Sequence, residues 1–233
     1  LLFKYLDARE DLSIQVHPND ALAKKRHNSF GKTEMWYVLQ ADTDARIIVG
    51  FKEKSNAAAY LESLKNKNLL SLLDTIPVQE GDVFFLETGT VHAIGAGLVI
   101  AEIQQTSDIT YRLYDFDRVD AQGNTRELHV DLALEAINYD VVESHKKYDT
   151  VSNQSNAVVD CPYFTTNFIP LDGEISVVNS GKSFTVYMCV DGAFELECDA
   201  VTYAYQKGDT ILIPAAMNAF VINGKASILE IYI

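Results

Sequence analysis

The sequence predicts an all-β-dominated protein built from two related β-barrels or jelly rolls with short helical insertions. Short runs of alternating or β-branched residues, each bounded by turn residues, recur along most of the 233 residues. A Gly-Asp turn that opens a strand occurs in each half of the chain, at 81–86 and at 208–214, after earlier strands at 35–39 and 186–190. This internal repeat indicates that the two halves share one β architecture.

The predicted strands of the first half are rich in β-branched and aromatic residues and end near glycine, proline, asparagine or aspartate. They are expected at 12–16, 34–39, 46–50, 83–86, 98–104 and 109–114. Residues 1–7 also have strand character but begin in mid-pattern, so we expect an N-terminal portion to precede them.

Two helical insertions are predicted among these strands. The longer one, at 56–73, carries apolar residues at helical spacing, at Leu61, Leu64, Leu69 and Leu72. Ser55 or Asn56 is placed to cap its start. A shorter helix is predicted at 130–138, with Asp131 near its N-terminus. The polar segment 144–156 then separates a first domain, 1–143, from a second domain of short strands, 157–233.

Composition excludes several classes of function. Asp and Glu number 33 against 19 Lys and Arg, a net charge of −14 that opposes general nucleic-acid binding but permits a small phosphorylated substrate in a locally basic pocket. No run of 18 apolar residues is present, so no membrane span is expected. The three cysteines are too few for a disulfide framework, which favours a reduced, cytoplasmic setting.

Four polar residues of the first half have the pattern of a metal site. Gln15 and His17 are two apart on a predicted strand, so both side chains leave the same face. Glu34 begins the next strand, and His92 follows a turn that contains Gly89. A barrel brings such positions together in its interior, where nitrogen and oxygen donors bind zinc or a similar divalent ion. Spacing alone does not exclude ordinary polar roles for them.

Several ordered motifs around these residues resemble those of the type I, cupin-class phosphomannose isomerases. They are QVHPND at 15–20, GKTEMW at 31–36, GTVHA at 89–93, EIQQTSD at 102–108 and TYRLYD at 110–115. The resemblance covers the chain to about residue 140, and the C-terminal half more loosely. It implies two cupin-like barrels, of which the first, 1–143, is the metal-binding catalytic domain.

The resemblance also implies roles for single residues. Gln15, His17, Glu34 and His92 would bind one divalent metal, most simply Zn²⁺. Arg112 and Lys32 would be catalytic. The candidates for substrate contact are Ser13, Glu102 and Asp108.

The activity that the resemblance implies is the interconversion of mannose 6-phosphate and fructose 6-phosphate through an enediol-type intermediate. We expect the metal to polarise the sugar oxygens and Arg112 to stabilise the developing oxyanion. Lys32 could assist proton transfer or ring opening if burial beside a metal lowers its pKa. The base that removes the C2 proton stays open among Glu102, Lys32, His92 and a metal-bound water. The oligomeric state is not predicted.

Alternatives remain at this point. A neutral amide is a weak zinc donor, so a site of His17, Glu34 and His92 completed by water is an alternative to the set with Gln15. The same donors suit an iron-dependent oxygenase, and a non-catalytic sugar-binding protein is a third class. The second domain has no histidine in the segment 215–219 that corresponds to the neighbourhood of His92, so no metal is expected there.

Overall fold

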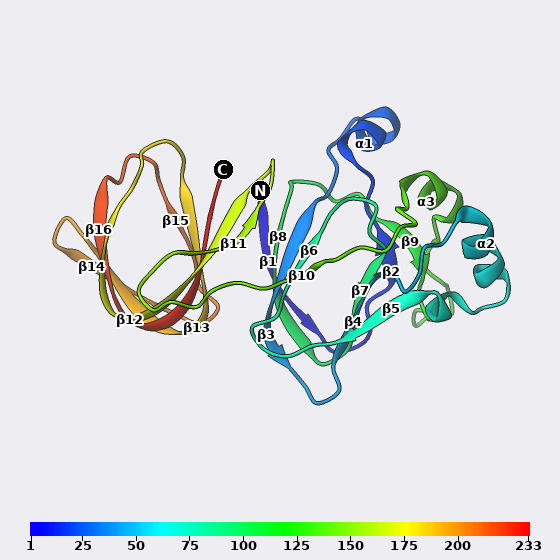
Figure 1. Ribbon diagram of the computed structural model, residues 1–233, viewed down its shortest axis with the longest axis horizontal. Helices are drawn as coiled ribbons and strands as arrows, with labels where there is room; N and C mark the ends of the chain where they lie inside the picture. Colours follow the sequence, from blue (N-terminus) through cyan, green and yellow to red (C-terminus); the bar gives the residue numbers. More distant parts are fainter. The chain divides into compact units, whose positions relative to one another are not determined.

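The chain folds into two compact units, Leu1–His145 and Lys146–Ile233, each built mainly of antiparallel strands (Figure 1). The structure is a computed structural model that describes residues 1–233. The prediction of an all-β-dominated protein is confirmed, and the short helices belong to the first unit. None of these helices has the length and apolar character needed to cross a membrane.

Two five-stranded sheets form the N-terminal unit. The first sheet has the order β1-β8-β3-β6-β10, with strands Leu2–Ala8, Leu98–Gln104, Glu34–Ala41, Val83–Leu86 and His145–Lys146. The second has the order β5-β4-β7-β2-β9, with strands Leu73–Pro77, Arg46–Phe51, His92–Ile94, Ile14–Val16 and Tyr111–Tyr114. Strands that are distant in sequence, such as β2 and β7, therefore lie side by side.

Each sheet of this unit has an apolar inner face, since side chains alternate along a strand. The core between the sheets includes Trp36, Ile47 and Phe84. The other face of the second sheet is also buried, because helices pack against residues such as Ile48. Burial on both faces explains why β4 is a nearly continuous apolar run rather than an alternating one.

The predicted helix at 56–73 is shorter in the structure. Asn56 does cap it, and its side chain accepts a hydrogen bond from the Ala59 amide at 3.0 Å. However, α2 (Ala57–Lys65) ends before Lys67, which has a left-handed φ of 54° that a helix cannot continue. A 3₁₀ turn, η1 (Leu69–Ser71), and the start of β5 follow. The second predicted helix is confirmed as α3 (Val130–Ala136).

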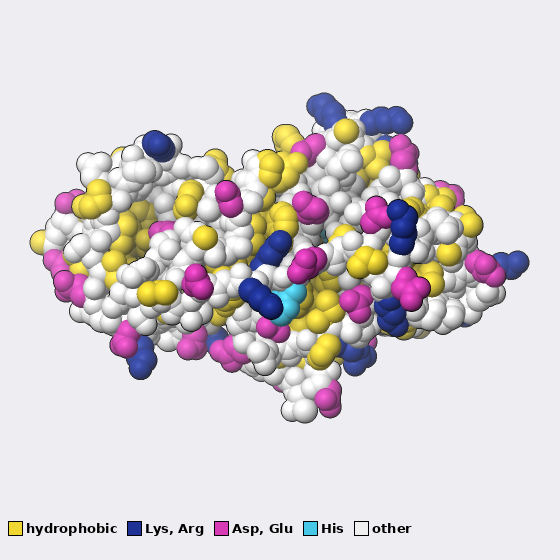
Figure 2. All heavy atoms as spheres, in the orientation of Figure 1, with side chains coloured by type: hydrophobic (Ala, Val, Ile, Leu, Met, Phe, Trp, Pro, Cys, Tyr) yellow, Lys and Arg dark blue, Asp and Glu magenta, His cyan; other side chains and the backbone are white.

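One helix, α1 (Asp20–His27), was not predicted, because its Pro-Asn-Asp start suggested only a turn. The Asn19 side chain caps it by accepting from the Leu22 amide at 2.9 Å. Asp20 also accepts from the Gly31 amide at 2.7 Å, which ties the start of α1 to the chain that leads into β3. Lysine and arginine side chains gather over this helix in Figure 2.

The C-terminal unit is one curved sheet whose long strands surround an interior (Figure 1). Its strand order is β11-β12-β16-β13-β14, and β15 pairs with β13. The strands are Asn156–Asp160, Thr165–Val178, Ala219–Tyr232, Thr185–Cys198 and Val201–Gln206, with β15 at Thr210–Ile213. Side chains such as Ile169, Ile222 and Ile228 fill the interior.

A buried carboxylate anchors the loop after β9. Asp115 is 5% exposed and accepts hydrogen bonds from Arg118 at 2.5 Å and from Arg126 Nε at 2.7 Å. Burial alone would raise the pKa of Asp115, but the two guanidinium groups outweigh it and lower that pKa. The loop therefore depends on the ionised form of Asp115.

Replacing Asp115 with Asn should lower the free energy of unfolding by about 1–3 kcal/mol at pH 7, because the half-buried Arg118 and the exposed Arg126 lose their buried anion. A group whose folded pKa is lowered stabilises the fold above its unfolded pKa, about 4, and this contribution is lost as the pH falls through the folded value. Urea titrations of both proteins at several pH values measure this. The exposed Glu62→Gln exchange is the charge-matched control. If the difference in unfolding free energy between the parent and Asp115→Asn stayed constant down to about pH 2.5, the role of ionised Asp115 would be contradicted.

Candidate metal centre

The candidate ligands converge on one end of the N-terminal unit. Gln15 lies on β2 directly opposite His92 on β7, and Glu34 is the first residue of β3. His17 follows β2 by one residue and shares the face of Gln15, whereas Val16 between them points into the core on the other side. The two sheets thus contribute donors from both sides of one interior.

The donor atoms are close enough to bind one ion. One ligand atom from each of His17, Glu34 and His92 lies within 4.8 Å of the others. The Glu34 carboxylate spans the two rings, with oxygens 3.7 Å from His17 Nε2 and 3.4 Å from His92 Nε2. The Gln15 amide nitrogen lies 3.3 Å from His92 Nε2. A rotation of that amide by half a turn would present its oxygen instead.

Both histidines are held in the tautomer that metal binding needs. His17 Nδ1 donates to the Ile109 carbonyl and His92 Nδ1 donates to the Thr90 carbonyl, each at 2.8 Å. Nε2 of each ring therefore keeps its lone pair toward Glu34. Burial lowers the pKa of both rings, that of His17 well below its ordinary value, so both are neutral at pH 7.

Glu34 is the buried carboxylate of the cluster. Its side chain is fully buried, and neither oxygen takes part in a hydrogen bond of regular geometry. Lys32 supplies a cation, with Nζ 2.6 Å from Oε2. A buried carboxylate is unfavourable unless cations or donors surround it. Two neutral imidazoles and a carboxylate with free lone pairs are the donor set of many divalent-metal sites, so the residues present fit such an ion.

Lys32 lies between two carboxylates. Its Nζ is 3.2 Å from His17 Nε2 and 3.7 Å from Glu102 Oε1, and the residue is 6% exposed. Burial lowers the pKa of Lys32, but Glu34 and Glu102 together raise it above its ordinary value. The two carboxylates outweigh burial because the tertiary structure places both of them beside the ammonium.

Glu102 on β8 is held by residues that sequence reasoning missed. Trp36 Nε1 donates to one oxygen at 3.2 Å, and Lys4 Nζ lies 2.7 Å from the other. Lys4 also donates to Gln104 at 2.6 Å. Lys4 is opposite Glu102 in the pairing of β1 with β8. No local sequence pattern around Lys4 predicts its contact with Glu102, because only the pairing of strands about a hundred residues apart brings these two residues together.

Arg112 and Ser13 lie together beside the cluster. Arg112 on β9 is opposite Gln15 in the register of β2 and β9, so the two share a face. Its Nε donates to Ser13 Oγ at 3.3 Å, and its NH1 donates to the Glu127 carbonyl at 3.0 Å. Asp108, the remaining predicted contact, is exposed and has no hydrogen bond or ion pair with the cluster.

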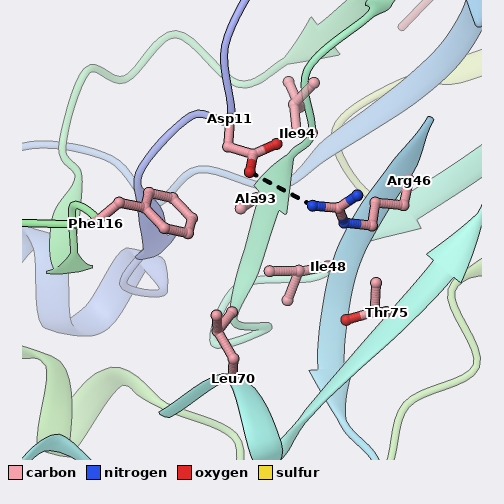
Figure 3. Close-up of a pocket in the computed structure, with 9 residues that line it drawn as sticks. Asp11, Arg46, Ile48, Leu70, Thr75, Ala93, Ile94 and Phe116 are labelled. Carbon is pink, nitrogen blue, oxygen red and sulfur yellow. Dashed lines mark ion pairs between the residues drawn. The ribbon is translucent and has the colours of Figure 1, made fainter. Parts of the chain in front are cut away.

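A separate apolar pocket lies on the outer face of the second sheet (Figure 3). Its volume is about 120 Å³, and an Asp11–Arg46 ion pair of 3.7 Å crosses its edge. Ala93 lines it, whereas the preceding residue, His92, points to the opposite face of β7. This pocket is therefore not part of the His17–Glu34–His92 cluster.

Comparisons with known proteins agree with this architecture. Residues 1–44 match the family model "Phosphomannose isomerase type I, catalytic domain", and residues 153–233 match "Mannose-6-phosphate isomerase, cupin domain". The chain is 37% identical to the mannose-6-phosphate isomerase ManA of Bacillus subtilis, over 97% of this chain and 72% of that protein. It is 35% identical to the mannose-6-phosphate isomerase of Streptococcus mutans, over 98% of this chain and 72% of that one.

The structural comparison extends over the whole chain. A crystal structure of the mannose 6-phosphate isomerase from Bacillus subtilis superposes with a TM-score of 0.92 at 33% identity, covering 100% of this chain and 74% of that one. Since a relative at 37% identity is covered over 72% of its length and the superposition takes in the whole of this chain, the chain belongs to the type I phosphomannose isomerase family.

Proposed function

We propose that the chain is a metal-dependent isomerase that interconverts mannose 6-phosphate and fructose 6-phosphate at the His17–Glu34–His92 cluster. Family membership supports the reaction. The observation that carries the site is the buried Glu34 carboxylate, which lies between two neutral imidazoles without a regular hydrogen bond. The three free cysteines are consistent with a reduced compartment, and we place the protein in the cytoplasm.

The metal we propose is one Zn²⁺ held by His17, Glu34 and His92, with Gln15 as a fourth ligand through its amide oxygen. Two histidines, a carboxylate and one further position are typical of catalytic zinc sites. A bound Zn²⁺ would supply Lewis-acid stabilisation of sugar oxygens. The carbonyl partners of both Nδ1 atoms orient the rings for this role.

The proton transfer requires an acid and a base beside the metal ligands. Lys32 bridges Glu34 and Glu102 and keeps its proton, which suits its ammonium to donate a hydrogen bond to a sugar oxygen during ring opening. Glu102 is the carboxylate of the cluster that we do not assign to the metal. We assign to Glu102 the removal of the C2 proton. Lys4 and Trp36 hold its carboxylate in one position, and neither residue belongs to the metal-binding set.

Arg112 completes the proposed machinery. Its guanidinium is only partly buried and is anchored on one side by Ser13 and the Glu127 carbonyl. The remaining N–H groups are available to an anionic oxygen of the substrate. Arg112 would stabilise the negative charge that develops on the enediol oxygens. Ser13 positions this guanidinium and offers a hydroxyl to the sugar phosphate.

Removing either histidine ligand should remove the metal. We expect His17→Ala and His92→Ala to retain less than about a tenth of the bound zinc and to lose turnover at least about 100-fold, because the remaining donors form an incomplete site. Elemental analysis of the dialysed proteins gives the stoichiometry. His145→Ala, which removes an exposed histidine of the same unit, is the matched control. Full metal occupancy in either ligand variant would refute the assignment.

Arg112→Ala should retain zinc and the fold but lower kcat by about 10²–10³, the effect of losing one donor to a developing oxyanion. Arg112→Lys should recover part of that loss, since it keeps the charge but not the planar fork. Coupled assays with mannose 6-phosphate measure both. The exposed Arg9→Ala exchange controls for net charge. Near-normal turnover in Arg112→Ala would exclude Arg112 from the chemistry.

Glu102→Gln should leave metal content unchanged and lower kcat by about 10²–10⁴, the usual contribution of a general base. The exchange of the C2 hydrogen of mannose 6-phosphate with deuterated water should slow to the same extent. Glu87→Gln, an exposed change of the same type, provides the control. If proton exchange stays fast while kcat falls, another group removes the proton.

A further inference from the structure

The interior of the C-terminal unit changes from apolar to polar at one end. Along β16, Ile222 and Ile228 face the core, but the next inward position is Glu230. Asn167 on β12 and Tyr187 on β13 lie directly opposite Glu230, one on each side. Side chains at the same register on neighbouring strands share a face. Three polar groups from three strands therefore form one row at the end of the apolar core.

The row is organised around the Glu230 carboxylate. Tyr187 donates to Oε1 at 3.3 Å, Asn167 donates to Oε2 at 3.1 Å, and Ser155 also donates to Oε2. Tyr187 is 1% exposed, and burial together with Glu230 raises its pKa, so its hydroxyl stays a donor at neutral pH. An ionised carboxylate offers about four lone-pair sites, so these three bonds leave acceptor capacity unused.

This row forms one wall of a hollow that lies entirely within the C-terminal unit. The hollow has a volume of about 450 Å³, within the range of small-molecule sites. Aromatic rings of Phe220 and Tyr232 line it beside the polar row, and Lys182 lies at its exposed rim. Ser183 is a further hydroxyl-bearing residue of the lining.

The lining indicates the chemistry of a ligand. A carboxylate, an amide and hydroxyls provide paired donors and acceptors of the kind that vicinal sugar hydroxyls satisfy. The aromatic rings offer flat apolar surface to the C–H face of a sugar ring. A fixed negative charge in the wall disfavours phosphate groups near Glu230. We propose that this hollow is a second binding site, for a neutral monosaccharide or polyol, in the unit that lacks the metal-ligand set.

The test uses the zinc-loaded full chain with D-mannose, D-mannitol and mannose 6-phosphate as probes. Calorimetry measures affinity, and amide chemical shifts locate binding in 1–145 or in 146–233. D-mannose or D-mannitol should bind saturably and shift amides near Tyr187 and Glu230. Glu230→Gln should weaken this binding at least about tenfold, since a neutral amide accepts weaker hydrogen bonds than a carboxylate. Turnover of saturating mannose 6-phosphate should be unchanged in this variant.

Tyr232→Phe provides a second variant if Glu230→Gln loses its fold, since it removes one hydroxyl at the half-buried edge of the hollow. It should weaken the neutral sugars several-fold. Glu174→Gln, an exposed change on β12, is the matched control and should bind as the parent does. Absence of saturable binding by both neutral probes, shifts confined to 1–145, or unaltered affinity in Glu230→Gln and Tyr232→Phe would each overturn the proposal.

Discussion

Burial of the Glu34 carboxylate is the constraint on which the N-terminal unit depends. A charge at this depth is tolerated only when other groups compensate for the lost water. Lys32 does so at 2.6 Å, and the His17 and His92 rings, both neutral, keep their lone pairs toward the same point. The arrangement is incomplete as a hydrogen-bond network, whereas its lone pairs converge as they do in divalent-metal sites, and this is the observation behind the proposed metal centre.

The same constraint extends to a chain of alternating charges. Lys4 contacts Glu102, Glu102 lies near Lys32, and Lys32 contacts Glu34, with distances of 2.7, 3.7 and 2.6 Å between the charged atoms. Each cation stabilises the anion beside it, so removal of one member leaves another charge uncompensated. This coupling holds the proposed acid and base at fixed positions. It also explains why the pKa of Lys32 is raised despite its burial.

The two units differ in their sheets, two in the first and one in the second, but their interiors share a pattern. In each, the inward face of a β structure is apolar over most of its length and polar at one end. In the first unit that end carries two histidines and Glu34, and in the second it carries Glu230 with tyrosine and asparagine. The second set contains no histidine, so the proposed metal centre and the proposed site for neutral hydroxyl groups differ in their donor atoms.

The sequence by itself determined the features that depend on local periodicity. Side chains two apart on a strand share a face whatever the strand pairs with, so the common direction of Gln15 and His17 followed from spacing alone. The short helix at α3 and the Asn56 cap were equally local. The end of α2 could not be predicted in this way, because composition does not indicate that Lys67 adopts a left-handed backbone conformation.

Only the tertiary structure decided which distant residues meet. The contacts of Lys4 with Glu102, and of Tyr187 and Asn167 with Glu230, arise from the register of strands separated by tens of residues. A shift of one residue in that pairing would turn these side chains to the other face without altering any local pattern. Register is set by the packing of whole sheets, and for that reason the sequence predicted the candidate metal ligands but not the groups that hold and extend the site.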